Sequence, residues 1–281
     1  MSNIISDDAA EKLLASINIP SRPSILVEIQ REKNKKDPDI RIIVQIISKD
    51  IALTAALLKT ANSPFFGLRK KAESVQQAAM SMGFDNVVSI VDGIALKSAM
   101  SLKEAKLERF WDSAEKVAIV AAYLSKILPD IPKEEAYMFG LFRDCGIPIM
   151  MQKFPDYKQT LLKADSGPKS SFTRVEDEIH STNHATLGYL LAKSWSLPSS
   201  ICLAILNHHD LSILHAHDDF SSEARNLIAI ARVAEYLCDV RQLRDDRDWK
   251  EVSSQVLSYL GITAGEFEDI KEEVFHYQET V

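Results

Sequence analysis

The sequence has little cysteine, little glycine and no excess of positive charge. Its three cysteines, Cys145, Cys202 and Cys238, lie far apart without any Cys-x-x-Cys spacing, which excludes a disulfide framework and indicates a reducing compartment, most simply the cytoplasm. The formal net charge of −7 leaves no concentrated positive field, so we expect neither nucleic acid nor an anionic membrane as a partner. No apolar run approaches the roughly 18 residues of a membrane span. The amino terminus has no basic flank or long apolar core, so we expect no secretory signal.

The scarcity of glycine, with 9 in 281 residues, accompanies apolar residues spaced three and four apart, which predicts helices almost throughout. With 46% hydrophobic residues the chain can bury a large core, as one domain or as two helical lobes. The predicted fold class is all-α, a multi-helix bundle. We expect helices near residues 7–16, 23–33, 39–48, 50–61, 74–82, 85–100, 105–127, 133–145, 155–164, 173–180, 184–195, 198–209, 222–240, 248–260 and 263–276.

Three helix starts carry a capping box, a hydroxyl residue followed three positions later by Gln or Glu. They begin at Ser74, Thr173 and Thr263. Residues 165–171 and 210–222 are polar and lack a helical period, so we expect surface loops there.

The amino-terminal third contains a distinctive series of short motifs. Pro20-Ser21-Arg22-Pro23 begins a helix, Asp50-Ile51 precedes an Ala/Leu-rich helix, and Asn62-Ser63-Pro64 ends it. We expect Asn62 and Ser63 to hydrogen-bond the exposed backbone groups of this helix end, Pro64 to stop the helix, and Phe65 and Phe66 to anchor the loop. A further helix closes in Met82-Gly83.

The order of these motifs resembles the HDOD family, the bacterial HD-related output domain. Members share a Pro-x-x-Pro start, an Asp-Pro-like step, an Asn-Ser helix end and a helix closing in Leu-Gly. The resemblance implies an HDOD domain over residues 17–240, with an N-terminal helical lobe at 17–103 and an HD-like lobe at 104–240. Helices in 241–281 would pack on it.

The resemblance also implies a damaged metal site. The parent HD phosphohydrolases hold divalent metals with a His, a His-Asp pair and a distant Asp. By register these positions are Ser113, Arg143-Asp144 and Glu235, so two ligand histidines are lost and one Asp has become Glu. The Lys that commonly follows the His-Asp-x-Gly word is replaced by Ile147.

Arg143 has the strongest consequence, because guanidinium has no lone pair and does not deprotonate in proteins. At about 5 Å from a divalent ion and an effective dielectric of about 20, its charge would cost roughly 6–7 kcal/mol. An inward-pointing Arg143 would therefore exclude the ancestral metal, whereas an alternative geometry would let its forked donors contact a phosphate.

The remaining candidate ligands are Asp144, His184, His208, His209 and Glu235. His184 shares an apolar stripe with Leu187, Gly188 and Leu191, and His208 ends a second stripe, so both are expected in the interior of the bundle. One interpretation is that they are satisfied core histidines, with His208 or His209 paired to Asp144 or to a backbone carbonyl. The other is a retained or altered site, since a His/Asp set can hold Zn.

Other candidates are weaker. His215 and His217 beside Asp218 and Asp219 are expected to form a solvated loop rather than a metal trap. Cys145 adjoins Asp144, but adjacency supplies no activating base. Trp111 and Trp195 are expected in the core.

Two functions follow from the resemblance. The first is a non-catalytic signal-transduction module with no resident cofactor, whose pocket is structural or senses a small molecule or nucleotide. Because the domain fills most of residues 1–281, its input and output would pass through separate signalling proteins. The second is a phosphohydrolase that uses Fe, Mn, Zn or Mg on a nucleotide or cyclic dinucleotide.

Overall fold

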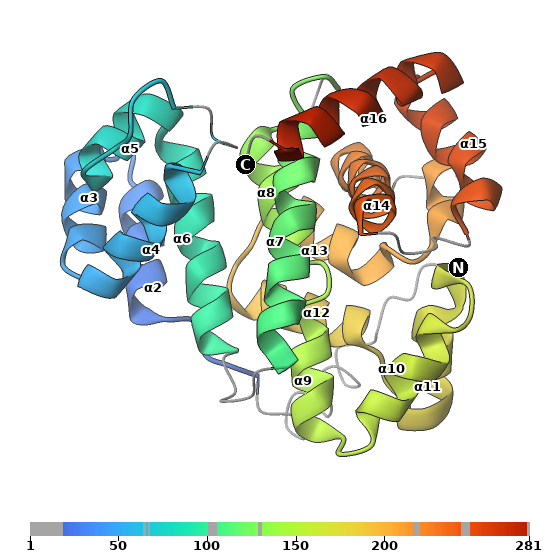
Figure 1. Ribbon diagram of the computed structural model, residues 1–281. Helices are drawn as coiled ribbons and strands as arrows, with labels where there is room; N and C mark the ends of the chain where they lie inside the picture. Colours follow the sequence, from blue (N-terminus) through green and yellow to red (C-terminus); the bar gives the residue numbers. More distant parts are fainter. Residues whose placement is uncertain are drawn as a thin grey trace.

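The computed structural model describes residues 19–63, 66, 68–100, 106–128, 131–215, 220–242 and 248–279. Regular secondary structure in these residues is entirely helical, which confirms the predicted all-α class (Figure 1). The helix expected at 7–16 lies outside the described residues.

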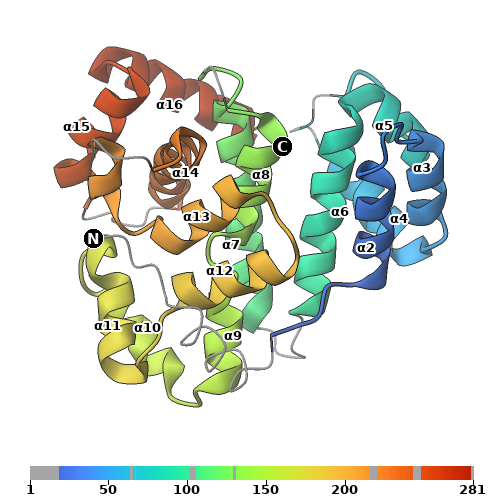
Figure 2. The same ribbon diagram turned by 180° about the vertical axis from the view of Figure 1, so that it is seen from behind.

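The first group of helices forms the blue-to-teal lobe in Figures 1 and 2. It consists of α2 (Ser24–Lys33), α3 (Ile40–Ser48), α4 (Ile51–Ala61), α5 (Val75–Met82) and α6 (Phe84–Ala99). Short polar side chains begin three of these helices: Asp39 accepts a hydrogen bond from the Arg41 amide, Asp50 from the Leu53 amide, and Ser74 from the Gln77 amide. Such caps satisfy backbone donors that the first helical turn leaves unpaired.

The second group is larger and contains the candidate ligands. It consists of α7 (Lys106–Leu124), α8 (Lys133–Phe142), α9 (Gly146–Lys153), α10 (Tyr157–Asp165), η2 (Lys169–Ser171), α11 (Phe172–His180), α12 (His184–Ser194), α13 (Ser199–Asn207), η3 (Leu211–His215), α14 (Ser222–Arg241), α15 (Trp249–Leu260) and α16 (Ala264–Glu279). Helix α14 contacts α7, α8 and α13, and the last two helices pack on its other side. The boundaries proposed at 103/104 and 240/241 stay predictions.

Small residues let the helices around the site approach closely. A Cβ atom added to Gly140 of α8 would lie 2.6 Å from the Ala118 Cα of α7. One added to Gly146, at the start of α9, would lie 1.9 Å from the carbonyl oxygen of His184. The turn before α9 is therefore held directly against the start of α12.

Two tryptophans belong to the core, as expected: Trp111 is 2% exposed and Trp195 is fully buried. The Trp195 indole N–H donates to the Pro20 carbonyl at 2.9 Å, so the chain just before α2 is attached to the end of α12. This bond links the two groups of helices.

The predicted helices agree with the structure to within a few residues at most ends, but three local expectations were wrong. Helix α9 was missed. Helix α11 begins at Phe172 rather than at a Thr173 cap. The third, the role of Asn62, is corrected below; the Ser74 and Thr263 hydroxyls do accept the expected capping bonds. Short 3₁₀ turns, η2 and η3, lie within the two expected loops.

Asn62 acts on the loop rather than on its own helix end. Its side chain accepts from the Ala72 amide at 2.7 Å and donates to the Ala72 carbonyl at 2.8 Å. This two-bond clamp closes the chain between α4 and α5. The hydroxyl of Ser63 has no hydrogen-bond partner in the described part of the chain.

Candidate metal centre

Four side chains from three helix ends converge in the second lobe. Asp144 lies in the turn between α8 and α9, His184 is the first residue of α12, and His208 and His209 follow the end of α13. One ligand atom from each lies within 4.8 Å of the other three. Sequence reasoning named all four, and the structure brings them together.

The distances between these atoms are close to those of a metal coordination shell. The Nε2 atom of His184 lies 3.1 Å from Nε2 of His209 and 3.4 Å from Nε2 of His208. Oδ1 of Asp144 lies 3.5 Å from Nε2 of His184 and 3.4 Å from Nε2 of His208. Four ligand atoms placed about 2.0–2.1 Å from one tetrahedral centre are about 3.3–3.4 Å from each other. These four distances lie close to that spacing, so the residues present fit a divalent cation in a near-tetrahedral arrangement.

Hydrogen bonds on the far side of the rings determine which nitrogens face the group. His184 Nδ1 lies 2.7 Å from Oε2 of Glu176, and His208 Nδ1 lies 2.8 Å from the Ile205 carbonyl. Both acceptors require a proton on Nδ1, which leaves each Nε2 with a lone pair directed at the group. Each such lone pair can bind a metal ion, or can accept a proton shared with a neighbouring ring.

Glu176 is the residue that sequence reasoning missed. It is fully buried, accepts hydrogen bonds from the Tyr157 hydroxyl, and accepts from both the backbone N–H and Nδ1–H of His184. Its spacing from Thr173 predicts a role in a helix cap instead. The signal was the i, i+4 spacing of Phe172, Glu176 and His180, which places a carboxylate on the same helix face as two rings.

An aromatic side chain covers the histidines. The Phe172 ring stacks on the His209 ring, with 5.3 Å between the ring centroids and 11° between the ring planes. It meets the His184 ring edge-on, with a centroid distance of 5.3 Å. Burial and the neighbouring His208 and His184 lower the pKa of His209 well below its ordinary value. Burial also lowers the pKa of His184, but the Glu176 and Asp144 carboxylates outweigh it and the net pKa is raised.

Arg143 points inward and every nitrogen of its guanidinium has an acceptor. Nε lies 2.6 Å from Glu235, Nη1 lies 2.5 Å from the Gly140 carbonyl, and Nη2 lies 3.0 Å from Oδ2 of Asp144. Burial opposes ionisation of Asp144, yet Arg143 and the two histidines hold the pKa of this carboxyl well below its usual range. These contacts use three of the five guanidinium N–H groups and direct every nitrogen at a protein acceptor.

Glu235 does not join the histidines. Its carboxylate pairs with Arg143, with Lys169 at 3.6 Å and with Arg232 at 3.8 Å. Burial raises the pKa of Glu235, but Lys169, Arg143 and Arg232 outweigh it and lower the pKa overall. The expected ligand has become the counter-ion of the arginine, because the extra cation needs a compensating carboxylate.

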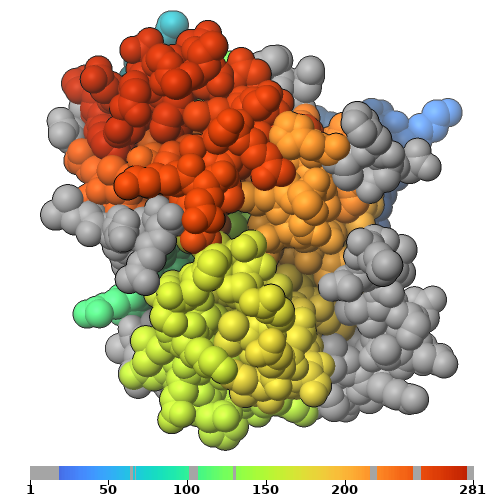
Figure 3. Space-filling model, turned by 90° about the vertical axis from the view of Figure 1, so that its right-hand side faces the viewer, coloured from blue at the N-terminus to red at the C-terminus, as the bar shows by residue number. Residues whose placement is uncertain are grey.

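A cavity of about 530 Å³ opens beside this group. Ser113, the predicted position of a lost ligand, lines it together with Arg143, Asp144 and His184. Lys158 and Lys169 also line it, and Lys169 was not singled out from the sequence because it lay in an expected loop. A second cavity of about 480 Å³ lies beyond His209 and is lined by residues of α11, α12, α13 and α15. Figure 3 shows a face of the molecule on which the yellow surface meets orange and red surfaces.

The other candidates have ordinary structural roles. Cys145 is fully buried, and burial followed by the Asp144 charge raises the pKa of its thiol, which is the opposite of an activated nucleophile. His215 Nε2 lies 3.1 Å from the Gln255 carbonyl. His217, Asp218 and Asp219 lie outside the described residues.

Residues 19–211 match the HDOD domain family, which covers more than half of the chain. The chain belongs to the HDOD family. The predicted resemblance is thereby confirmed, and the helices that carry Ser113, Arg143, His184 and His208 all lie in the matched region.

Solved structures agree with this HDOD fold. A protein of Shewanella amazonensis, provisionally named a phosphohydrolase, is 19% identical, with a TM-score of 0.71 over 96% of this chain and 92% of that one. A protein of Marinobacter aquaeolei, provisionally named a signal transduction protein, is 20% identical, with a TM-score of 0.70 over 97% of this chain and 58% of that one. At these identities the likeness concerns the fold alone.

A curated relative extends the comparison. An uncharacterized protein of Treponema pallidum is 28% identical over 269 residues, which are 92% of this chain and 50% of the relative. The HDOD chain described here thus spans about half the length of that relative. None of the helices in the described ranges combines the length and apolar character that a membrane crossing demands.

Proposed function

We propose that this chain is a non-catalytic HDOD module of signal transduction. In this proposal the four side chains of Asp144, His184, His208 and His209 hold one structural divalent cation. One observation carries the proposal: the Arg143–Glu235 pair adjoins a closed group of four ligand atoms. A bound cation would join the turn before α9 to the start of α12 and to the end of α13. It would thereby set the shape of the second lobe.

The closed group favours structure over catalysis. Catalytic zinc sites keep three protein ligands and leave a fourth position for water, whereas structural sites use four protein ligands. Here Asp144, His184, His208 and His209 together supply four. Three imidazoles with one carboxylate suit Zn or Fe better than Mg, which prefers oxygen ligands.

Arg143 also opposes the hydrolase chemistry. Two-metal hydrolases place their ions about 3.5–4 Å apart, with both ions acting on one reacting group. The guanidinium lies 3.0 Å from Oδ2 of Asp144, the oxygen left over when Oδ1 faces the histidines. The Glu235 carboxylate offsets the Arg143 charge for the one ion at the histidines. A second divalent ion beside Asp144 would lie next to the guanidinium itself and would be repelled.

The module would act through protein partners in the cytoplasm. The family and the signal transduction name of the Marinobacter structure support this assignment, and the greater length of the Treponema relative is consistent with HDOD units working beside other segments. Pull-down from the native cell, followed by identification of the bound proteins, tests it.

A phosphohydrolase remains the second candidate because Lys158 and Lys169 line the same cavity as Asp144 and could attract a phosphoester. An assay with bis(p-nitrophenyl) phosphate separates the two functions. We expect no turnover by the wild-type chain after loading with Zn²⁺, Mn²⁺ or Fe²⁺. Metal-dependent turnover that His184→Ala abolishes would overturn the non-catalytic assignment.

The double variant Ser113→His with Arg143→His provides the matched gain of function. It restores two imidazoles at positions that line the cavity, so we expect the number of bound ions per chain to rise. Unchanged metal content in a folded double variant would mean that the neighbouring pocket no longer fits a second ion.

A further inference from the structure

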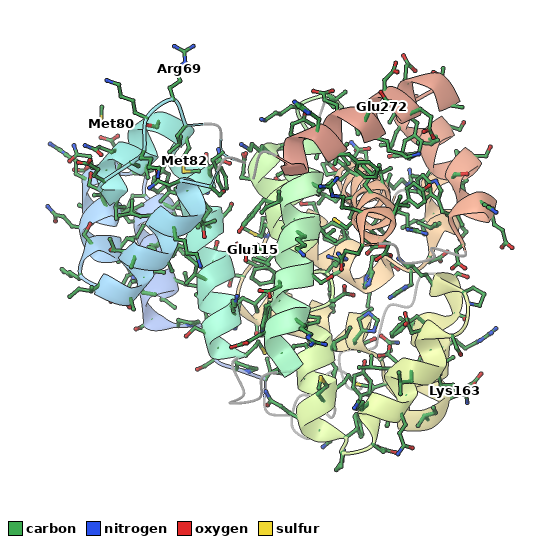
Figure 4. The ribbon with its side chains drawn as sticks, viewed as in Figure 1. Arg69, Met80, Met82, Glu115, Lys163 and Glu272 are labelled. Carbon is green, nitrogen blue, oxygen red and sulfur yellow. The ribbon has the colours of Figure 1, made fainter. Side chains whose placement is uncertain are left out.

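A separate cavity of about 330 Å³ lies between the two groups of helices. Its lining comes from α4 and the residue that follows it, from α6, and from α7 and α8, so both lobes contribute. Figure 4 shows Glu115 on the side of α7 that faces α6. None of the candidate metal ligands lines this cavity.

Two residues of the lining carry an unsatisfied polar group. The indole N–H of Trp111 and the hydroxyl of Ser63 are buried without a hydrogen-bond partner among the residues that the structure describes. Trp111 is only 2% exposed, and an unsatisfied buried donor costs about 1–3 kcal/mol. Each such group in a native structure calls for a physical explanation, and a bound ligand that accepts its hydrogen is one.

Charges of both signs surround these donors. Glu115 is half-buried and has no hydrogen bond or ion pair with another residue of the described ranges. It lies close enough to Tyr137 that, after burial, its charge is the second cause that raises the pKa of the phenol. Lys59 and Lys97, both exposed, line the same cavity.

The rest of the lining is apolar. Ile94 and Leu141 supply aliphatic surface, and Gly93 allows α6 to approach α8 so closely that an added Cβ would lie 2.3 Å from Leu141. The volume is at the lower end of the roughly 300–1,000 Å³ of ligand cavities, which suits a small metabolite and excludes a dinucleotide.

We propose that this cavity between the lobes binds a small zwitterion of the amino-acid class with an apolar side chain. The ligand carboxylate accepts hydrogen bonds from Trp111 and Ser63 and faces the lysines. Its ammonium faces Glu115 and the Tyr137 ring, where carboxylate and π-face both favour a cation. Its side chain packs on Ile94 and Leu141.

Because both lobes line the cavity, the ligand would stabilise their present arrangement. A ligand that binds only the folded state raises the unfolding temperature in proportion to its occupancy. This binding is independent of the cation group and of the proposed function, so each can fail without the other.

The test uses the full 281-residue chain, thermal unfolding and calorimetric titration. The probes are L-leucine, L-valine, L-methionine and L-phenylalanine, with 4-methylpentanoate and 3-methylbutylamine as analogues that lack one charge of leucine. We expect at least one of the amino acids to bind, and each single-charge analogue to bind at least about tenfold more weakly than leucine, since a charged hydrogen bond contributes about 1.5–3 kcal/mol. Absence of binding by all four amino acids, or equal binding by the analogues, would overturn the proposal.

Variants locate the site. Glu115→Gln removes the acceptor charge at a half-exposed position and is expected to weaken binding at least about tenfold, whereas Glu108→Gln, exposed on the same helix, leaves it unchanged. Trp111→Phe keeps an aromatic ring and removes the N–H, so it should weaken binding as well. Binding that survives Glu115→Gln in a chain with unchanged circular dichroism would also overturn the proposal.

Discussion

Arg143 and Asp144, adjacent in the sequence, form an ion pair with Nη2 and Oδ2 3.0 Å apart, while Oδ1 of the same carboxylate lies 3.5 Å from Nε2 of His184. One carboxylate is therefore shared between a permanent cation and a group of histidines. The arginine does not simply occupy a lost ligand position, because Glu235 has become its counter-ion.

Arg143→Met is expected to destabilise the chain by about 3–5 kcal/mol, because it leaves the partly buried carboxylates of Glu235 and Asp144 without their main partner. Urea unfolding followed by circular dichroism measures the loss. Arg174→Met is the control: Arg174 is exposed, its one ion pair within the described residues is with Glu178 at 3.9 Å, and its removal should change stability by less than about 1 kcal/mol.

The double variant Arg143→Met with Glu235→Met should recover a large part of that loss, since replacing a whole buried ion pair by apolar side chains is often close to neutral. If Arg143→Met were no more costly than Arg174→Met, the buried pair would not hold this part of the fold.

Glu176→Gln is expected to weaken binding of Zn²⁺ or Co²⁺ by about 10–100-fold. The amide keeps the shape of the side chain but no longer supplies the negative charge that orients His184 and makes its Nε2 a stronger donor. Titration of metal-free protein with Co²⁺, followed by its visible absorption, gives the affinity. Glu178→Gln, exposed on the same helix, should leave the metal affinity unchanged. Equal affinities in the two variants would show that Glu176 does not support metal binding by His184.

Gly146→Ala is expected to cost about 3 kcal/mol and to disturb the metal group, because the new methyl would lie 1.9 Å from the His184 carbonyl. Gly265→Ala is the matched control variant, since a Cβ added at this position has nothing within 4 Å of it. Replacing a helical glycine by alanine there should raise stability by up to about 1 kcal/mol. Thermal unfolding of both variants checks the contrast. A tolerated Gly146→Ala would mean that α9 and α12 can separate.

Asp92→Asn tests a buried carboxyl in α6. Burial raises the pKa of Asp92 to about 7, while Arg22 and Lys33 act in the opposite direction. Between about pH 4 and about pH 7 the folded state thus keeps this proton, whereas the unfolded chain releases it. The contribution of the Asp92 proton to folding stability is therefore complete below about pH 4 and is lost as the pH rises through about 7.

Relative to Asp92→Asn, the wild type should therefore lose about 3–4 kcal/mol of stability between about pH 4 and about pH 8, because each unit of pKa shift corresponds to about 1.4 kcal/mol. Urea unfolding of both proteins across this range gives the difference. A parallel pH dependence in the two chains would show that Asp92 titrates normally.

The sequence predicted most helices because their apolar spacing and caps are local signals. Helix α9 was missed since Gly146 and Pro148 look like a turn, yet a proline in the first helical turn lacks only an N–H that would be unpaired anyway. Among the converging ligands, Asp144 followed from the family register, and His184 and His208 followed from apolar stripes that indicated the interior of the bundle.

What stayed hidden depended on contacts between distant segments. Glu176 has the spacing of a capping residue, but the demand of buried His184 for an acceptor decides its position. Glu235 reads as a ligand until Arg143 is seen beside it. The unpartnered Trp111 could be placed in the core from the sequence, but its missing acceptor could not.

The most direct test of the account is the metal content of the chain purified without a histidine tag, measured by inductively coupled plasma mass spectrometry. We predict about one Zn or Fe per chain, lost in His184→Ala and retained in Glu178→Gln, as expected for one tetrahedral group beside a fixed arginine. Wild-type protein without metal after equilibration with Zn²⁺ and Fe²⁺, or protein with two ions per chain, would contradict it.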